Sequence, residues 1–327
     1  MTVDARVESA VEMLGPAQAR LVAAVPWEAL EPSLREACPA VDGLGGFHGR
    51  LPFHPIDQRD GGVVLPRAVE AALLRLIATV AGEHALDQLG RVDVEIIECA
   101  GGEPLRFAAV LDIRPSITVP DPSSLRVQVG PLSVPEDEVE AYLDALRQRL
   151  AESTEVNPAD AEVDMDGHDV RTALTERLRQ AKNAQRLRAA RNEVLMRLTA
   201  AAAVPAPEGL VRDEVENRRQ WMLAELQRLG TSLADHLAAT GTTDEQVEAD
   251  LLAATAQRVR SQLLLDAVAD AERLSVSAAE VSEAVAHLGG PATGTDVRRG
   301  KALAVLMQRV VLVDPAGRPV TAADLST

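Results

Sequence analysis

Aromatic residues and cysteines are scarce in this sequence. Two tryptophans, one tyrosine and three phenylalanines stand among 327 residues, so any core must be built from Leu, Val, Ala and Ile. The two cysteines, Cys38 and Cys99, fit a reducing compartment, and their spacing matches neither a metal site nor a redox pair. The chain also shows no apolar run of about 18 residues and no cleavable leader. We therefore expect a cytoplasmic protein without a membrane partner.

Acidic residues outnumber basic ones, 50 against 33, for a net charge of −17. A broad nucleic-acid-binding face is therefore not expected, and an acidic rim should keep the protein monomeric or in a weak homodimer. Residues 171–204 reverse the balance and could contact RNA. We favour a solvated helix face answered by nearby carboxylates, with no direct reading of nucleic acid. The basic residues of this run are Arg171, Arg177, Arg179, Lys182, Arg186, Arg188, Arg191 and Arg197.

The stretch from Asp169 to Gly290 predicts one long helical body. Its first helix has two offset apolar stripes and ends at Val204-Pro205-Ala206-Pro207, because proline cannot continue the hydrogen-bond ladder. A second helix closes at Gly230, and a third starts near the cap residue Thr243. The third helix becomes apolar nearly all round at its end, so Leu263–Val268 should be the buried centre of the body. Two shorter helices follow, near Ser277–His287 and Thr295–Val311.

Before this body, the sequence predicts an α+β domain whose small, mostly antiparallel sheet is covered by two helices. Alternating residues on either side of Leu14-Gly15-Pro16 indicate a β-hairpin. Helices are expected from Pro26 to about Cys38 and from about Gly62 to Leu86. Three further strands are expected at Val92–Glu98, Leu105–Ile113 and Leu125–Val129. The predicted domains are 1–134 for this part, 135–168 for a linker helix with an acidic linker, and 169–327 for the helical body.

No constellation of residues indicates an enzyme. His48 and His54 stand six residues apart, which is not a helical ligand spacing. Residues 162–167 resemble the start of a calcium loop, but Ala173 stands where the bidentate glutamate belongs. The stretch 43–46 lacks the ending of a phosphate loop, and the chain lacks a nucleophile elbow. We expect no catalytic residue, no metal and no cofactor.

A loop and a helical region together carry a family resemblance. The loop between the first two predicted helices reads Gly46-Phe47-His48-Gly49-Arg50-Leu51-Pro52, and the helical region is Val204–Gly290 with a closing helix at Arg299-Gly300-Lys301-Ala302-Leu303. Both resemble the trigger factors, the ribosome-associated chaperones of bacteria. The loop is similar to the family's Gly-Phe-Arg-x-Gly-Lys-x-Pro docking signature. It is one residue shorter, and it has His48 in place of the arginine and Arg50 in place of the lysine.

The resemblance implies an ATP-independent chaperone with a ribosome-binding first domain and an all-α, two-armed body. The implied partners are the ribosome near the peptide exit and nascent or unfolded polypeptides. The family usually carries a peptidyl-prolyl isomerase domain between the linker helix and the long helix. Here the stretch from Leu150 to Asp169 is too short for another domain, so no isomerase activity is expected. The implied ribosome-binding residues are Phe47, His48, Gly49, Arg50 and Pro52.

The client-binding surface is expected on the second helix of the body, at Leu210, Trp221 and Met222. Leu210 and Trp221 lie about 80° off the apolar stripe of this helix, so one of them faces the client, or both pack against the neighbouring arm. Two alternatives to a ribosome-bound chaperone stay open. A ribosome-independent binding or assembly chaperone is favoured by the altered loop and the acidity. An exported chaperone with the same body is disfavoured by the missing leader.

Overall fold

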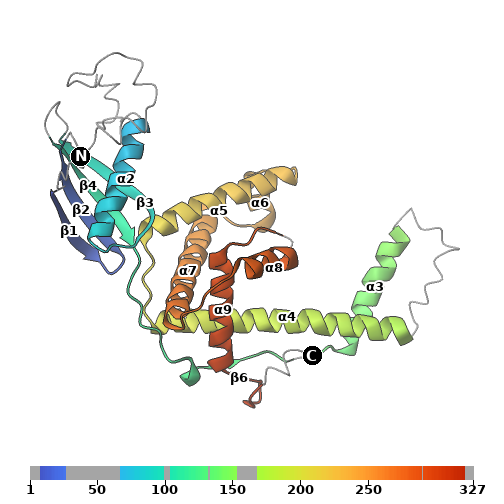
Figure 1. Cartoon of the computed structure of the whole chain (residues 1–327). Helices are drawn as coiled ribbons and strands as arrows, with labels where there is room; N and C mark the ends of the chain where they lie inside the picture. The colour runs from blue at the N-terminus through green and yellow to red at the C-terminus, as the bar shows by residue number, and fades with distance from the viewer. Residues whose placement is uncertain are drawn as a thin grey trace. The chain divides into compact units, whose positions relative to one another are not determined.

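The structure is a computed structural model of the chain (Figure 1). It describes residues 8–26, 67–98, 104–131, 133–152, 168–288 and 290–320. The chain forms two compact units, each built from two segments. The first unit joins 1–117 with 204–263, and the second joins 118–203 with 264–327. The sequence predicted three consecutive domains with boundaries at 134 and 168. These boundaries stay a prediction.

The first unit contains a four-stranded antiparallel sheet with the strand order β1-β2-β4-β3. β1 (Glu8–Gly15) and β2 (Gln18–Val25) form the hairpin that the turn at Gly15-Pro16 predicts. β3 (Gln88–Glu98) and β4 (Leu105–Ile113) confirm the next two predicted strands. The small antiparallel sheet of the predicted fold is therefore confirmed.

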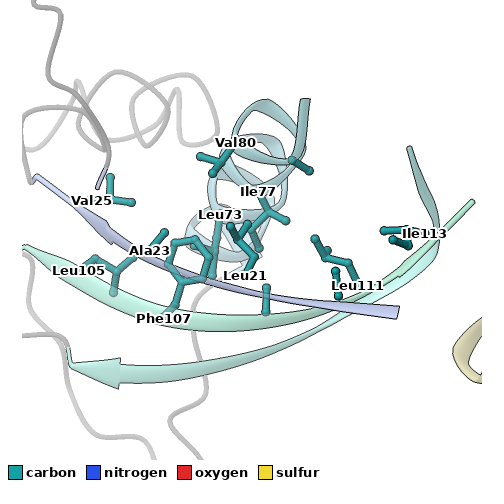
Figure 2. Close-up of a cluster of buried hydrophobic side chains, with 13 residues drawn as sticks. Leu21, Ala23, Val25, Leu73, Ile77, Val80, Leu105, Phe107, Leu111 and Ile113 are labelled. Atoms are coloured by element: carbon teal, nitrogen blue, oxygen red, sulfur yellow. The ribbon is translucent and has the colours of Figure 1, made fainter. Parts of the chain in front are cut away.

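The core of this unit lies between the sheet and α2 (Arg67–Glu83). Leu73, Ile77 and Val80 recur at the spacing of one helix face, and all three are buried. Figure 2 shows Leu73 and Ile77 pointing from the helix toward Leu21 and Phe107 of the sheet. The predicted helix from Gly62 to Leu86 is thus confirmed from Arg67 to Glu83, and it ends three residues before the predicted Leu86. The other covering helix, predicted up to Cys38, lies outside the described residues.

The predicted strand at Leu125–Val129 was wrongly placed in the first domain. The strand here, β5 (Arg126–Gln128), pairs in parallel with β6 (Val311–Val313) in the second unit. Prolines explain the error: Pro115 and Pro120 disfavour a turn of the chain directly after β4, so it does not fold back along the sheet. β6 itself was not predicted, because the last helix was expected to reach Val311.

The remaining helices confirm the predicted helical body. One short helix, α6, was missed, although the sequence Ser232-Leu233-Ala234-Asp235 carries its signal. The Ser232 hydroxyl accepts from the N–H of Asp235, and the Asp235 carboxylate accepts from the N–H of Ser232, which is a capping box. In chain order these helices are α3 (Glu136–Glu152), α4 (His168–Ala201), α5 (Glu208–Arg228), α6 (Leu233–Thr240), α7 (Asp244–Ala271), α8 (Ala278–Leu288) and α9 (Gly294–Arg309).

The apolar end of α7 is buried, as its sequence predicts. Asp266 lies within this buried stretch and forms a bidentate pair with Arg299 of α9, at 2.8 Å from Nε and 2.7 Å from Nη2. A buried carboxylate has to be paired, so Arg299 fastens α9 to the end of α7 within the second unit. The buried apolar residues here are Leu263, Leu264, Leu265, Val268 and Ala269.

The first turn of α5 is held on the sheet by Asp112 of β4. Asp112 is only 4% exposed, and its Oδ2 accepts from the backbone N–H of Leu210 at 2.7 Å. The backbone N–H of Gly209 also donates to this carboxylate. Asp112 thereby supplies the cap that Pro207, the residue before the helix, does not supply. The Leu210 side chain lies against Gly90, where an added Cβ would be 3.6 Å from Leu210 Cδ1.

Burial raises the pKa of the Asp112 carboxyl above its ordinary value, although the bonds from Leu210 and Gly209 and the charge of Arg212 act in the opposite direction. The folded protein therefore holds this proton more tightly than the unfolded chain does. It follows that the contribution of Asp112 to stability falls as the pH rises from 3.8 through the folded-state pKa. The positive end of α5 offsets part of the cost of burying the charge.

Gly209→Ala tests this contact, because a Cβ at Gly209 would lie 2.6 Å from Asp112 Oδ2. Alanine favours a helix by about 1 kcal/mol over glycine, yet we expect a loss of roughly 1–2 kcal/mol, as for a lost helix cap. Urea unfolding measures the change. The matched control is Gly300→Ala in α9, where an added Cβ meets nothing within 4 Å. It should stabilise the protein by about 1 kcal/mol.

The double variant Gly209→Ala with Asp112→Ala identifies the clashing group. Without the carboxylate, the substitution at Gly209 should cost nothing further, because the two sites are in direct contact and their effects are not additive. An equal loss in both backgrounds would show that the strain at Gly209 does not come from Asp112.

Candidate functional site

The helices α5 and α6 and the first part of α7, residues 208–263, form a helical arm in the first unit. α5 is closed by Gly230, whose φ of 73° lies in the left-handed region that glycine tolerates. α7 is opened by Thr243, whose hydroxyl accepts from the N–H of Gln246 at 3.2 Å while the Gln246 amide oxygen accepts from the N–H of Thr243 at 3.0 Å. The predicted cap at Thr243 is therefore confirmed.

Ion pairs join α5 to α7 along the arm. Arg219 donates to Glu248 and, at 3.3 Å, to Asp244, and these hydrogen bonds raise the pKa of Arg219. Nearer the start of α5 and further along α7, Arg258 Nη1 lies 3.1 Å from Glu214 Oε1. Exposed pairs of this kind contribute little to stability, so their main effect is to set which turns of the two helices face each other.

The apolar stripe predicted for α5 is only partly buried. Val211, Val215 and Leu226 are each at most 7% exposed, while Met222 is half-buried. Leu229, at the end of the stripe, is 62% exposed. The stripe is therefore buried at Val211, Val215 and Leu226, and it opens to solvent at Leu229, just after the end of α5.

Trp221 is the most exposed large apolar side chain among the described residues, at 75%. It lies about 80° around α5 from the buried Val211, and within the arm its side chain faces solvent. Leu229 and, on α7, Leu252 at 51% are also exposed on the arm. A large apolar side chain exposed to water is typical of a surface that binds a partner.

Leu210 and Trp221, which the sequence could not tell apart, have different surroundings. Leu210 lies against Gly90 and is bonded through its N–H to Asp112, so its side chain is engaged at the base of the arm. Met222 is half-buried beside Trp221. Sequence reasoning missed Asp112 because a single aspartate in a strand carries no signal of a helix 98 residues later.

The docking residues predicted from the loop lie outside the described residues. They are Phe47, His48, Gly49, Arg50 and Pro52. The segment 162–167 that resembles a calcium loop also lies outside them.

The part of the chain that the structure describes shows neither a metal-ligand cluster nor a membrane-spanning helix. No group of three or more His, Cys, Asp or Glu side chains there could hold a metal ion. Among the helices given above, none is long and apolar enough to cross a membrane.

Two family models cover most of the chain. The model of the bacterial trigger factor protein matches residues 7–146, and the model of the trigger factor C-terminus matches residues 168–298. Between them lies the short stretch in which the sequence analysis found no room for another domain.

Individual proteins that are similar to this chain are also trigger factors. The trigger factor of Salinispora arenicola is 32% identical, with 96% of each chain covered. The trigger factor of Frankia casuarinae is 27% identical, with 95% of this chain and 89% of the relative covered. A solved structure of a trigger factor chaperone covers 91% of this chain and 99% of its own, at 11% identity and a TM-score of 0.47, a likeness too slight to support a conclusion.

The alignment with the Salinispora protein runs over 432 positions, while this chain has 327 residues. The relative therefore has on the order of 100 residues without a counterpart here, which is the size of one small domain. This chain belongs to the bacterial trigger factor family, and its length fits a form without the isomerase domain.

Proposed function

We propose that this protein is an ATP-independent chaperone that holds nascent or unfolded polypeptides on its helical arm and docks at the ribosome exit through the loop 46–52. Family membership supports the general role, a chaperone that acts on nascent chains at the ribosome. The observation that carries the finer proposal is the exposed indole of Trp221, at 75%.

The surroundings of Trp221 suit weak and unselective binding. One turn further along α5, Glu225 is bonded to Arg228 at 2.5 and 2.9 Å, and this pairing lowers the pKa of Glu225. A client side chain that covers the indole therefore meets charges that are already paired. Such a contact shields an apolar segment without ordering it tightly, and it needs no nucleotide.

Docking at the ribosome has to overcome repulsion, because the ribosome is anionic and this protein carries a net charge of −17. A few close contacts must then hold the complex. Phe47 can serve as an apolar anchor, and Arg50 can donate charge-assisted hydrogen bonds to a carboxylate or phosphate. His48 is mostly neutral at pH 7 and replaces one positive charge of the signature. We therefore propose weaker docking than in relatives with the full signature.

The same observations favour the second candidate, a binding or assembly chaperone that works away from the ribosome. The altered loop and the acidity would then reflect the loss of docking. The two candidates share the arm and differ only in the loop, so one experiment on the loop separates them.

Holding activity should appear in an aggregation assay without ATP. Stoichiometric protein should delay the aggregation of a refolding client, and Trp221→Ala should require several-fold more protein for the same delay, because the exposed apolar contact is lost. Leu223→Ala is the matched control, since Leu223 is 38% exposed and lies about 200° around the helix from Trp221. In a Trp27→Phe background, Trp221 emission should shift to shorter wavelength with an unfolded chain. A wild-type protein that fails to delay aggregation would refute the holding proposal.

Ribosome docking should depend on the loop. We expect detectable co-sedimentation at low salt that is lost with Phe47→Ala or Arg50→Ala, and strengthened by His48→Arg because one favourable charge is restored. Measurement at two salt concentrations separates the charged contact from the apolar one. Tight binding that ignores both alanine substitutions would place docking on another surface. No binding even with His48→Arg would favour the ribosome-independent chaperone.

Isomerase activity should be absent. Because the stretch between α3 and α4 is too short for a further domain, an X-Pro bond in a short peptide should isomerise in the presence of the protein at its uncatalysed rate, on the order of tens of seconds or slower. The readout is the relaxation rate of a proline peptide at increasing protein concentration. A rate that grows with the protein concentration would disprove the expectation.

A further inference from the structure

α4 is one continuous helix (Figure 1). By their spacing in the sequence, its basic residues fall on two opposite faces of this helix. On the first face, every basic side chain is bonded within the second unit. Arg171 donates to Glu136 and Glu140 of α3, and Lys182 donates to Glu138. On this face the interpretation from the sequence, cations answered by carboxylates, is confirmed for every member except Arg186, which donates to the carbonyl of Gly130 and to the amide oxygen of Asn183. Its members are Arg171, Arg179, Lys182, Arg186 and Arg197.

The second face carries Arg177, Arg188 and Arg191, which we call the arginine stripe. At 100° per residue they lie within about 60° of one another, and about 175° from the mean direction of the bonded face. All three are exposed. Within the described residues, none of the three forms an ion pair, and Arg188 bonds only to the carbonyl of Ala184, at 3.3 Å, on its own helix.

Among the described side chains of α4, no acidic group lies on the face of the arginine stripe. Ala181 and Ala184 lie between the arginines, and the small side chains leave the guanidinium groups accessible. Glu176 and Glu193 lie about 90° and 165° around the helix from the stripe. Three exposed guanidinium groups on one line are an unusual feature in a chain with a net charge of −17.

We propose that the arginine stripe binds the phosphate backbone of RNA without reading its sequence. Arg188 and Arg191 stand about 4.5 Å apart along the helix axis, and Arg177 stands about 16 Å from Arg188. The guanidinium fork matches phosphate oxygens, so the stripe can contact neighbouring phosphates at one end and a more distant phosphate at the other. The expectation that this protein does not read nucleic acid is kept, since backbone contacts carry no sequence information.

The composition of the stripe favours RNA over an acidic polypeptide. A polypeptide partner needs apolar anchors in addition to charge, and the positions between Arg177 and Arg191 on this face hold alanines and no exposed large apolar side chain. Phosphate contacts need only cations and polar donors, and the amides of Gln180 and Asn192 flank the stripe. The contact lies on α4 and does not depend on the loop 46–52.

The test measures binding of a fluorescein-labelled single-stranded oligouridylate by fluorescence anisotropy over a range of salt concentrations. The stripe variant is Arg177→Gln/Arg188→Gln/Arg191→Gln. The control variant, Arg75→Gln/Arg228→Gln/Arg273→Gln, changes the net charge by the same amount at exposed arginines outside α4. We expect the stripe variant to bind at least about tenfold more weakly at low salt, and to reduce the slope of log affinity against log salt by about 2, as three phosphate contacts require.

The control variant should keep the wild-type slope, and Phe47→Ala should keep it as well, since the loop is not involved. Equal losses in the stripe and control variants would show a net-charge effect and overturn the proposal. Labelled polyglutamate that binds to the arginine stripe more tightly than the oligouridylate would assign the stripe to an acidic polypeptide instead. No measurable binding of RNA by the wild-type protein at low salt would also overturn it.

Discussion

The carboxylate of Asp112 at the first turn of α5 is the contact on which the arrangement of the first unit depends. Asp112 is buried on β4 and caps a helix whose preceding residue is a proline. Gly209 has no side chain and so leaves room for the carboxylate. The next residue, Leu210, donates its N–H to the carboxylate and lies against Gly90. Trp221, on the same helix, lies about 80° around from the buried Val211 and is exposed to solvent.

The arm beyond this contact is held by caps and ion pairs more than by a large core. Reciprocal capping boxes stand at Ser232 with Asp235 and at Thr243 with Gln246. In the second unit, Lys301 and the cap residue Ser277 lower the pKa of Glu280 to about 2, so this stabilisation is present above pH 4.5 and is lost as the pH falls toward 2. With few aromatic residues in the chain, an exposed tryptophan is a considerable apolar group to leave in water.

The sequence predicted the elements whose signals are local. Prolines at 205 and 207 mark the end of α4, alternation around Gly15 marks the hairpin, and the run from Leu263 to Val268 marks the buried end of α7. It could not predict contacts between distant segments, because no local pattern encodes them.

Three features depended on such distant partners. The parallel pairing of β5 with β6 joins segments far apart in the chain, and Asp112 caps a helix that follows it by nearly a hundred residues. The separation of the basic run into two faces became visible only when the partners of Arg171 and Lys182 were placed. The small helix α6 is a different case, since its capping box could have been read from the sequence.

Whether the exposed indole of the arm meets the client is tested most directly by site-specific crosslinking. A photoreactive amino acid in place of Trp221 would be illuminated with ribosomes that carry a nascent chain, and compared with the same group in place of Leu223, about 200° around the helix. Our interpretation predicts a crosslink to the nascent chain at position 221 that is much stronger than at position 223. Equal crosslinking at both positions, or none at 221 while the protein is bound to the ribosome, would contradict it.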